Sequence, residues 1–382
     1  MTMPRANTTT ISEGGQDPKE RLSYSDGHAH AFSRCVYNYR QTPPTWNEFL
    51  KMSLNQKLCV LEANMTEIIW MASLHNMEYQ AITDHAYLFS AARITYDQYR
   101  RVLNKSIAKL DRLGREANKV FIMPGVELNV KVAPGKEPYI DLEEICYGLT
   151  DPYPALNRMK LIIASVHDTD IKDRQYISTE GYLELLKANI KGLSQIWPPQ
   201  QRKGRVLICG HPWDAACRIN SKTYDSLART STAFKSAFPT PASFELFCPD
   251  APIPYFNQHQ LDELSRAFTE GGVIPELNLF QIYSRRAEVR RSRPYHPEDR
   301  PPILEAYLAH RKDNNLEPEI SIGSDAHVIG MIGKHFALRP RFAEILEQVP
   351  NLRNAITWGD RIKRSARPCD APYRRSSTRN VL

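Results

Sequence analysis

The chain has 382 residues, of which 42% are hydrophobic, so it can bury a sizeable core and its length suits a single α/β barrel. No run of about 18 apolar residues occurs, which excludes a membrane-spanning helix, and residues 1–20 lack the apolar segment of a signal peptide. The seven cysteines are odd in number and include no CxxC pair, which is typical of free thiols in a reducing compartment. We therefore expect a cytoplasmic protein without membrane contacts, whose residues 1–20 form a disordered leader.

The formal net charge of +7 is concentrated at the C-terminal end. Residues 361–382 contain seven Lys or Arg residues against one acid, Asp370, which leaves residues 1–360 with a net charge of +1. A basic tail of this kind either contacts nucleic acid or another anionic surface, or serves only as a solubilising end. The nearly neutral body argues against nucleic-acid binding by the whole chain.

Short β-branched or apolar runs alternate with helical patterns along the chain. In chain order, the strand-like runs are SYSDGH (23–28), YQAITDH (79–85), VFIMPGVEL (120–128), EEICYGL (143–149), LIIASVH (161–167), RVLICGH (205–211), FELFCP (244–249), GVIPELN (272–278) and EISIGSD (319–325). Helical patterns cover residues 46–76, 96–117, 179–192, 257–270 and 302–312. This alternation predicts an α/β fold with a mostly parallel sheet and crossover helices.

At least six of the strand-like runs end in His, Glu or Asp. In parallel α/β architectures the carboxyl ends of the strands converge on one rim, where barrel enzymes place their chemistry. Because these polar ends continue from His28 to His327 without a linker, we interpret residues 21–345 as one barrel-like domain. Residues 284–302, rich in Pro and Arg, are interpreted as a long loop over the same rim, and residues 346–382 as a C-terminal helix and basic tail.

The candidate metal ligands follow these strand-like runs directly. DGHAH places His28 and His30 two residues apart, so that both face the same side of an extended strand. The remaining candidates are His85 in TDHA, Glu127 in GVELN, His167 in SVHD, His211 in CGHP, and Asp325 and His327 in GSDAH. Any one motif alone is more often a surface or core feature. Gathered on one rim, however, six histidines and two carboxylates without partners would cost several kcal/mol, so the set predicts metal ions. Mixed nitrogen and oxygen ligands favour Zn, Mn or Fe over Mg or Ca.

The ordered series DGHAH, TDH, GVELN, SVH, GHP and GSDAH resembles the motif series of PHP (polymerase and histidinol phosphatase) domain proteins over roughly residues 23–330. The resemblance implies a distorted (β/α)7 barrel of the PHP type, with two to three divalent transition-metal ions at its C-terminal rim. By position, one implied ligand set is His28, His30, Glu127 and Asp325. A second is Glu127, His167 and His211, with Glu127 bridging. His85 and His327 would hold part of a third ion.

One part of the series departs from the family pattern. Members with three metals usually carry a further His or Asp shortly after the HxH pair, whereas residues 31–40 here are AFSRCVYNYR. Cys35 is either a substituted thiolate ligand or a small buried residue. His75 is a less suitable donor because it lies late in an apolar helical pattern. The third ion is therefore the least well defined by the sequence.

The resemblance implies hydrolysis of a small phosphate ester through metal-activated hydroxide. Glu127, Asp325 and His327 are the expected catalytic residues. Asp84, Asp168 and Asp214 each lie beside a motif and are interpreted as proton shuttles, ring-orienting carboxylates or turn caps.

Substrate contacts are expected from Arg285, Arg286 and Asn278, although a solvated basic loop explains the two arginines equally well. Glu276 is a further candidate for the pocket lining. Two alternatives use the same metals: a nuclease that contacts nucleic acid through residues 284–302 and the basic tail, and an amidohydrolase-like enzyme that cleaves a C–N or C–O bond. A PHP scaffold without activity is disfavoured by the intact ligand series.

Overall fold

The computed structural model describes residues 25–31, 44, 46–75, 77–112, 120–132, 136–167, 179–212, 229, 256–278, 302–327, 332, 352 and 355–359. Several predictions lie outside these residues. They are the leader 1–20, Cys35, Asp168, Asp214, the run 244–249, residues 284–301 of the predicted loop 284–302, with Arg285 and Arg286, and the tail 361–382.

Seven parallel strands succeed one another across the sheet in chain order. They are β1 (Ser25–Asp26), β2 (Tyr79–Ile82), β3 (Phe121–Lys131), β5 (Leu161–Ser165), β6 (Val206–Gly210), β7 (Ile274–Asn278) and β8 (Glu319–Gly323). Each neighbouring pair on this path is parallel, which confirms the predicted α/β fold with a parallel sheet. Two short strands were not predicted: β4 (Tyr139–Ile140) pairs antiparallel with β3, and β9 (Ile356–Thr357) pairs parallel with β8.

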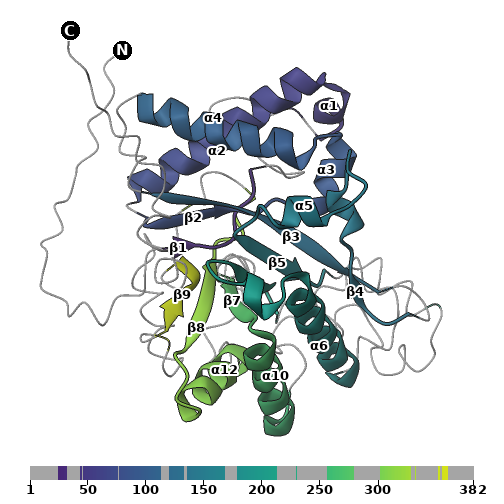
Figure 1. Ribbon diagram of the computed structural model, residues 1–382, viewed down its shortest axis with the longest axis vertical. Coiled ribbons are helices and arrows are strands. Elements are labelled where there is room, and N and C mark those ends of the chain that lie inside the picture. Colours follow the sequence, from purple (N-terminus) through teal and green to yellow (C-terminus); the bar gives the residue numbers. More distant parts are fainter. Residues whose placement is uncertain are drawn as a thin grey trace, which may run out of the picture.

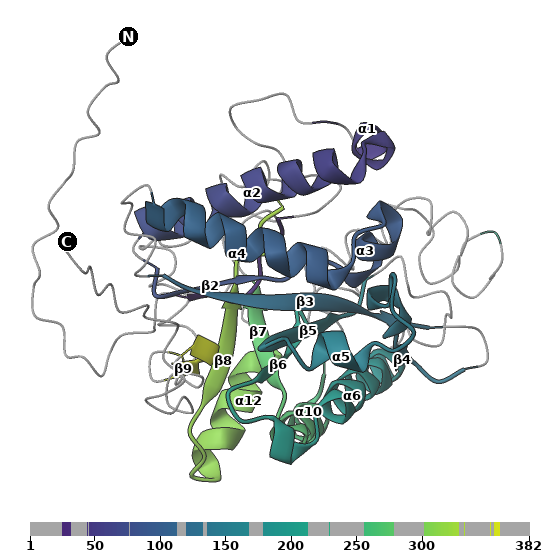
Figure 2. The same ribbon diagram turned by 45° about the horizontal axis from the view of Figure 1, so that its top comes forward.

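The sheet curls so that the segments after β1 and β8 lie side by side (Figures 1 and 2). The backbone N–H of Gly27 donates to the carbonyl of Ile322 at 2.7 Å, and that of Asp325 donates to the carbonyl of His28 at 2.7 Å. Ala29 and Ala326 form a parallel bridge one step further on. The DGHAH and GSDAH motifs are thereby brought together from opposite ends of the sequence. The result is a curled parallel sheet compatible with a (β/α) barrel.

Helices cover the outside of the sheet, with α2 and α4 on one side and α6, α10 and α12 on the other (Figure 1). The helices are α1 (Trp46–Lys51), α2 (Leu54–Leu74), α3 (Ala86–Ala92), α4 (Tyr96–Arg112), α5 (Tyr153–Leu156), α6 (Thr179–Ile196), α10 (Gln258–Gly271) and α12 (Pro302–Asp313), with 3-10 turns η3 (Glu143–Ile145) and η6 (Pro199–Gln201). Each of the five predicted helical stretches contains a helix, and residues 113–117 of the stretch predicted at 96–117 lie outside the described residues. Residues 46–76 form two helices because Ser53 starts α2 with a capping box to Gln56. Among the described helices, none combines the length and apolar character needed to cross a membrane.

The strand predicted at residues 143–149 is wrong, because this segment forms the 3-10 helix η3 followed by a turn at residues 147–148. Asp141 accepts a hydrogen bond from the backbone N–H of Glu143 at 3.0 Å, and Glu144 turns back to Asn129 and Lys131 on β3. Side-chain bonds of this local kind compete with a sheet ladder for the backbone. The apolar side chains of Ile145 and Cys146 favoured a strand, because these hydrogen bonds cannot be read from the sequence.

Alternation along the strands separates two hydrophobic clusters. On β5, Leu161 and Ile163 belong to the smaller cluster on the inner face of the curl, whereas Ile162 and Ala164 face the larger cluster beneath the helices. Side chains two residues apart share a face. The inner face therefore continues from Ile163 to His167 and, on β3, from Met123 to Glu127. The apolar interior of the sheet thus gives way to polar side chains at the carboxyl ends of the strands.

Candidate metal centre

All eight predicted ligands lie within the described part of the chain and gather at one end of the curled sheet. Seven of them follow the ends of strands, and the eighth, Glu127, lies within the long strand β3. Their elements, in order, are the segment after β1 (His28, His30), the β2–α3 connection (His85), β3 (Glu127), and the segments after β5 (His167), β6 (His211) and β8 (Asp325, His327).

Glu127 lies at the centre of this cluster, and its two oxygens face different histidines. Oε2 lies 3.4 Å from Nε2 of His28, 3.7 Å from Nε2 of His30 and 2.7 Å from Nδ1 of His85. Oε1 lies 3.6 Å from Nε2 of His167 and 3.4 Å from Nε2 of His211. Every ion-pair partner that Glu127 has among the described residues is a histidine. This arrangement is suited to a carboxylate that bridges two ions.

Four distances within the first ligand set are close to the edge lengths of a tetrahedral metal site. Asp325 Oδ1 lies 3.2 Å from Nε2 of His30 and 3.7 Å from Nε2 of His28. Together with the two distances to Glu127 Oε2, this gives four edges between 3.2 and 3.7 Å. An ion with tetrahedral bonds of about 2.0–2.1 Å keeps its ligand atoms ~3.3 Å apart. These four edges match such an ion, and the ligand atoms of His28, His30 and Asp325 all lie within 4.8 Å of one another.

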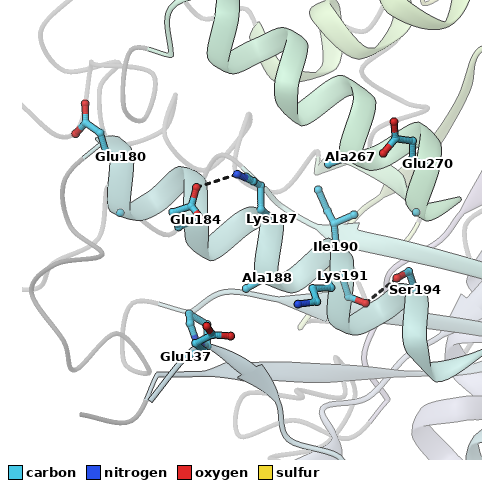
Figure 3. A pocket seen from close by; sticks show the side chains of 13 residues that line it. Glu137, Glu180, Glu184, Lys187, Ala188, Ile190, Lys191, Ser194, Ala267 and Glu270 are labelled. Carbon is cyan, nitrogen blue, oxygen red and sulfur yellow. Dashed lines mark hydrogen bonds and ion pairs between the residues drawn. The ribbon is translucent and has the colours of Figure 1, made fainter. Parts of the chain in front are cut away.

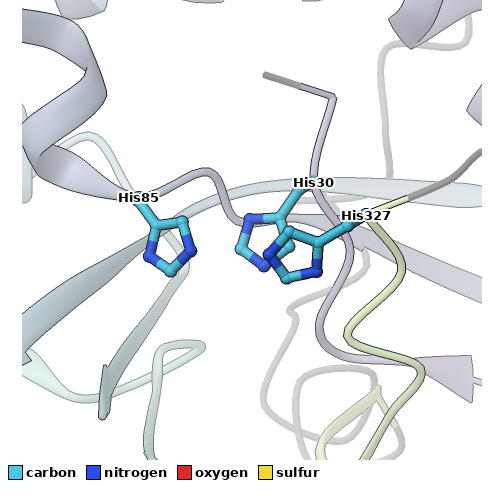
Figure 4. Close-up of side chains that lie close together, drawn as sticks. All are labelled: His30, His85 and His327. Atoms are coloured by element: carbon cyan, nitrogen blue, oxygen red, sulfur yellow. The ribbon is translucent and has the colours of Figure 1, made fainter. Parts of the chain in front are cut away.

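A third group consists of His30, His85 and His327, whose ligand atoms lie within 4.8 Å of one another. Figure 4 shows the three rings converging from different connections. The ring centroids of His30 and His327 are 4.3 Å apart, and those of His30 and His85 are 4.6 Å apart. His85 also groups with Glu127 and His167. The structure therefore places His85 between two groups, whereas the family resemblance assigns it to a third ion alone.

Several potential metal-ligand atoms in this cluster are buried without a hydrogen bond. They include both carboxylate oxygens of Glu127, Nε2 of His28, Nδ1 of His30 and Nδ1 of His85. Buried polar atoms normally find a partner, because an unsatisfied one costs about 1–3 kcal/mol. Nε2 of His28 and Nδ1 of His85 both face Glu127 Oε2, and a set of nitrogen and carboxylate ligands is what transition metals bind. The residues present thus fit the metal ions that the sequence predicted.

The carboxylates of the cluster are held in their ionised form. Burial alone would raise the pKa of Glu127, but His85 and His28 keep it well below its ordinary value. Burial likewise opposes ionisation of Asp325, whose pKa is nevertheless held well below its usual range by His28 and His327. Ionised carboxylates are the metal-binding form.

The directions of their pKa shifts divide the histidines of the cluster into two groups. Burial lowers the pKa of His167 to about 3 and that of His30 well below its usual value, so both imidazoles are neutral. Burial also acts against charge on His28 and His211, yet Glu276 and Glu127 raise the pKa of His28, and Glu127 raises that of His211 to about 9. The cluster as a whole attracts positive charge, which a divalent cation supplies.

Two ligands have backbones in the left-handed region. His211 has φ 28° and Asp325 has φ 47°, and they are two of four such non-glycine residues in the described part of the chain. This conformation costs on the order of 1 kcal/mol or more for a non-glycine residue and is concentrated at functional sites. The surrounding hydrogen bonds must hold it. For Asp325 the backbone N–H bond to the carbonyl of His28 does so.

Sequence reasoning missed the polar residues beneath the ligands. Asp26 is buried and accepts bonds from the backbone N–H groups of His28 at 3.1 Å and Ser324 at 2.9 Å, and from Ser324 Oγ at 2.6 Å. Burial raises the pKa of Asp26 to about 6. Asp26 stands two residues before the HxH pair, but the sequence does not reveal that its side chain is buried. Asp26 fixes the two motifs that supply the first ligand set.

Asn278, predicted to contact substrate, is buried beside the ligands. Its amide donates to Asp325 Oδ2 at 3.2 Å and to Glu276 Oε2 at 3.4 Å. His327 is oriented similarly, because its Nδ1 lies 2.9 Å from the carbonyl oxygen of Asp325 and leaves Nε2 as the ligand atom. The structure thus brings Asn278 to the site, while its contact with substrate stays a prediction.

Asp84 precedes His85 and is the one aspartate beside a motif that the structure describes. Its Oδ2 accepts a hydrogen bond of 2.5 Å from Tyr99 on α4, and both side chains are buried. We expect Tyr99→Phe to lower the free energy of unfolding by about 1.5–3 kcal/mol, because a buried carboxylate loses a hydrogen bond. Chemical denaturation measures this loss. Unchanged stability would contradict it, and metal content should remain that of the wild type because Tyr99 is no ligand.

A separate cavity of about 930 Å³ lies between α6, α10 and residues 137–138 (Figure 3). Its lining includes Glu137, Glu184, Lys187 and Glu270, and none of the predicted site residues. Lys187 is paired with Glu184 at 2.9 Å and with Glu263 at 2.6 Å. These pairs resemble an ordinary charged surface, and the cavity lacks the convergent donors of the histidine cluster.

Comparison with known proteins adds no family to these observations. Neither the protein-family models nor the curated proteins include a match to this chain. The functional interpretation therefore depends on the residues and geometry of the metal centre.

Proposed function

We propose that this chain is a metal-dependent hydrolase of the PHP type, built on a distorted (β/α)7 barrel, that hydrolyses a small phosphate ester. The seven parallel strands in chain order and the ordered ligand motifs support the fold assignment. Two to three Zn, Mn or Fe ions are its cofactors. Glu127, Asp325 and His327 are its catalytic residues in this proposal.

The observation that carries the proposal is the position of Glu127. Its carboxylate is buried, both of its oxygens lack a hydrogen bond, and each oxygen faces its own set of imidazole nitrogens. A purely structural carboxylate would be bonded to N–H or O–H donors of fixed geometry. A bridging ligand for two ions requires the arrangement that Glu127 has.

Charge favours an anionic substrate. Three buried carboxylates face the imidazoles of the centre: Glu127, Glu276 and Asp325. Two divalent cations exceed their combined negative charge, and a third increases the excess further. When bound, such ions lower the pKa of water and neutralise charge that develops on a phosphoryl group. A phosphate dianion suits this positively charged site better than a neutral amide does.

Exposure defines the side from which substrate approaches. The side chains of His167 and His327 are 26% and 31% exposed, whereas that of His28 is completely buried. Substrate therefore meets His167 and His327 first. His327, oriented by its Nδ1 bond to the Asp325 carbonyl, presents Nε2 to this opening and can hold a proton or a ligand there.

A substrate panel with and without residues 361–382 tests the proposed reaction against its alternatives. We expect turnover of small phosphomonoesters that survives deletion of the tail and depends only weakly on salt, because a single phosphate enters the site. A nuclease that uses the tail would release several counterions on binding and would lose affinity steeply as salt rises. Turnover confined to oligonucleotides and lost with the tail would overturn the proposal. Inactivity on both panels with metals bound would favour C–N or C–O bond hydrolysis.

A further inference from the structure

We propose that Glu276 is a positioning residue that couples the two ligand sets by holding the ring of His28 and the backbone of His211 with one carboxylate. The inference rests on the proposed metal centre and assigns a role to a residue that is not one of the eight predicted ligands. Glu276 lies in β7 and is fully buried. Its side chain enters the cluster from the inner face of the sheet.

One oxygen of Glu276 determines how His28 is presented. Oε1 lies 2.9 Å from Nδ1 of His28, and an ionised carboxylate can only accept, so Nδ1 carries the proton. Nε2 is then the nitrogen with a free lone pair. That atom is the one that faces Glu127 and Asp325. Glu276 thus selects the tautomer in which His28 can serve as a ligand.

The other oxygen of Glu276 holds His211. Oε2 accepts the backbone N–H of His211 at 2.8 Å, at the residue whose φ of 28° lies in the left-handed region. This bond helps to maintain a backbone conformation that is unfavourable for a histidine. The imidazole of His211 consequently reaches Oε1 of Glu127, on the side opposite His28. One carboxylate therefore orients a ligand in each of the two sets.

The space for this carboxylate is created by Gly323 on β8. A Cβ at position 323 would overlap Glu276 Oε1 and would also meet the Cβ of His28. Gly323 is not required for a turn, since its backbone does not have a positive φ. The glycine instead allows Glu276 to pass between β8 and His28. This close packing indicates that the contact between Glu276 and His28 is a specific part of the site.

Glutamine at position 276 separates shape from hydrogen bonding. Glutamate accepts at both oxygens, from His28 at one and from His211 and Asn278 at the other, whereas glutamine accepts at one and donates at the other. If the amide oxygen faces the N–H of His211 and the amide of Asn278, its NH₂ group faces Nδ1 of His28. His28 must then accept at Nδ1, which protonates Nε2 and removes the lone pair needed for a metal. In the opposite orientation His211 loses its acceptor.

The test compares Co²⁺ and Zn²⁺ binding to metal-free wild type, Glu276→Gln and Glu144→Gln. Titration, elemental analysis and the visible absorption of bound Co²⁺ report on each ligand set without any substrate. We expect Glu276→Gln to weaken one ion by about 10–100-fold and to alter the Co²⁺ spectrum, because loss of such a supporting contact typically has this effect. Glu144→Gln, which also removes a partly buried carboxylate but one that bonds Asn129 and Lys131, should match the wild type.

Histidine ¹⁵N chemical shifts provide a second measurement that does not depend on the folding of a variant. In the Zn²⁺-loaded wild type, His28 should carry its single proton on Nδ1, and in Glu276→Gln a population with the proton on Nε2 should arise. Wild-type affinity and spectrum in Glu276→Gln would overturn the inference, and so would a Zn²⁺-loaded wild type whose His28 carries a proton on Nε2. If the wild type itself binds no metal, the proposed function fails instead, which distinguishes the two outcomes.

Discussion

Replacing Glu127 with glutamine should reduce turnover of the best phosphomonoester by about 100–1,000-fold and lower the metal content by at least one ion. A neutral amide offers one weak oxygen ligand in place of a bridging carboxylate, and loss of the ions removes several kcal/mol of transition-state stabilisation. The side chain keeps its shape, so the fold should remain largely intact. Steady-state kinetics and elemental analysis, with circular dichroism as the test of folding, measure the three effects.

The matched control is His75→Ala. His75 ends α2 as its C-cap and belongs to none of the ligand groups in the described part of the chain. Its replacement should leave metal content and turnover unchanged. If the two variants behaved alike, the assignment of Glu127 as a bridging ligand would be wrong.

Removal of bound metal is expected to destabilise the fold strongly. At a free metal concentration of about 1,000 times Kd, each site contributes ~4 kcal/mol to the free energy of unfolding, and a chelator removes this contribution. The metal-free protein also retains Glu127, Glu276 and Asp325 as buried carboxylates whose compensating charge is then supplied by histidines alone. Thermal unfolding with chelator, and again after Zn²⁺ is restored, measures the shift.

A midpoint of thermal unfolding that changes with neither chelator nor Zn²⁺ would contradict the proposed metal binding. The effect should also be smaller in Glu127→Gln, since fewer ions are bound to that variant at the start. A chelator effect of the same size in both proteins would indicate a site elsewhere.

The sequence was informative where a pattern repeats locally. The continuous apolar run of Leu161–Ser165 identifies a buried strand, and a His, Glu or Asp at a strand end identifies the polar rim without knowledge of contacts. The same reasoning failed at residues 143–149, where hydrogen bonds accepted by Asp141 and Glu144 override an apolar composition.

The supporting residues could not be assigned from sequence, because their roles depend on partners that are remote along the chain. Glu276 contacts His28 across 248 residues, and Asp26 contacts Ser324 across 298. A glutamate in GVIPELN is equally compatible with a pocket-lining residue. The shared membership of His85 in two groups is likewise a matter of ring placement, which motif order does not encode.

The bonds that join residues 27–30 to residues 322–326 also have a consequence for biosynthesis. A ribosome delivers the DGHAH motif early and the GSDAH motif almost three hundred residues later, although domains tend to fold in the order of their synthesis. Until the second motif emerges, His28 and His30 have neither Asp325 nor the neighbouring strand that aligns them. The first ligand set is therefore completed only after residue 325 has been synthesised, and a chain terminated before that residue lacks the carboxylate of Asp325.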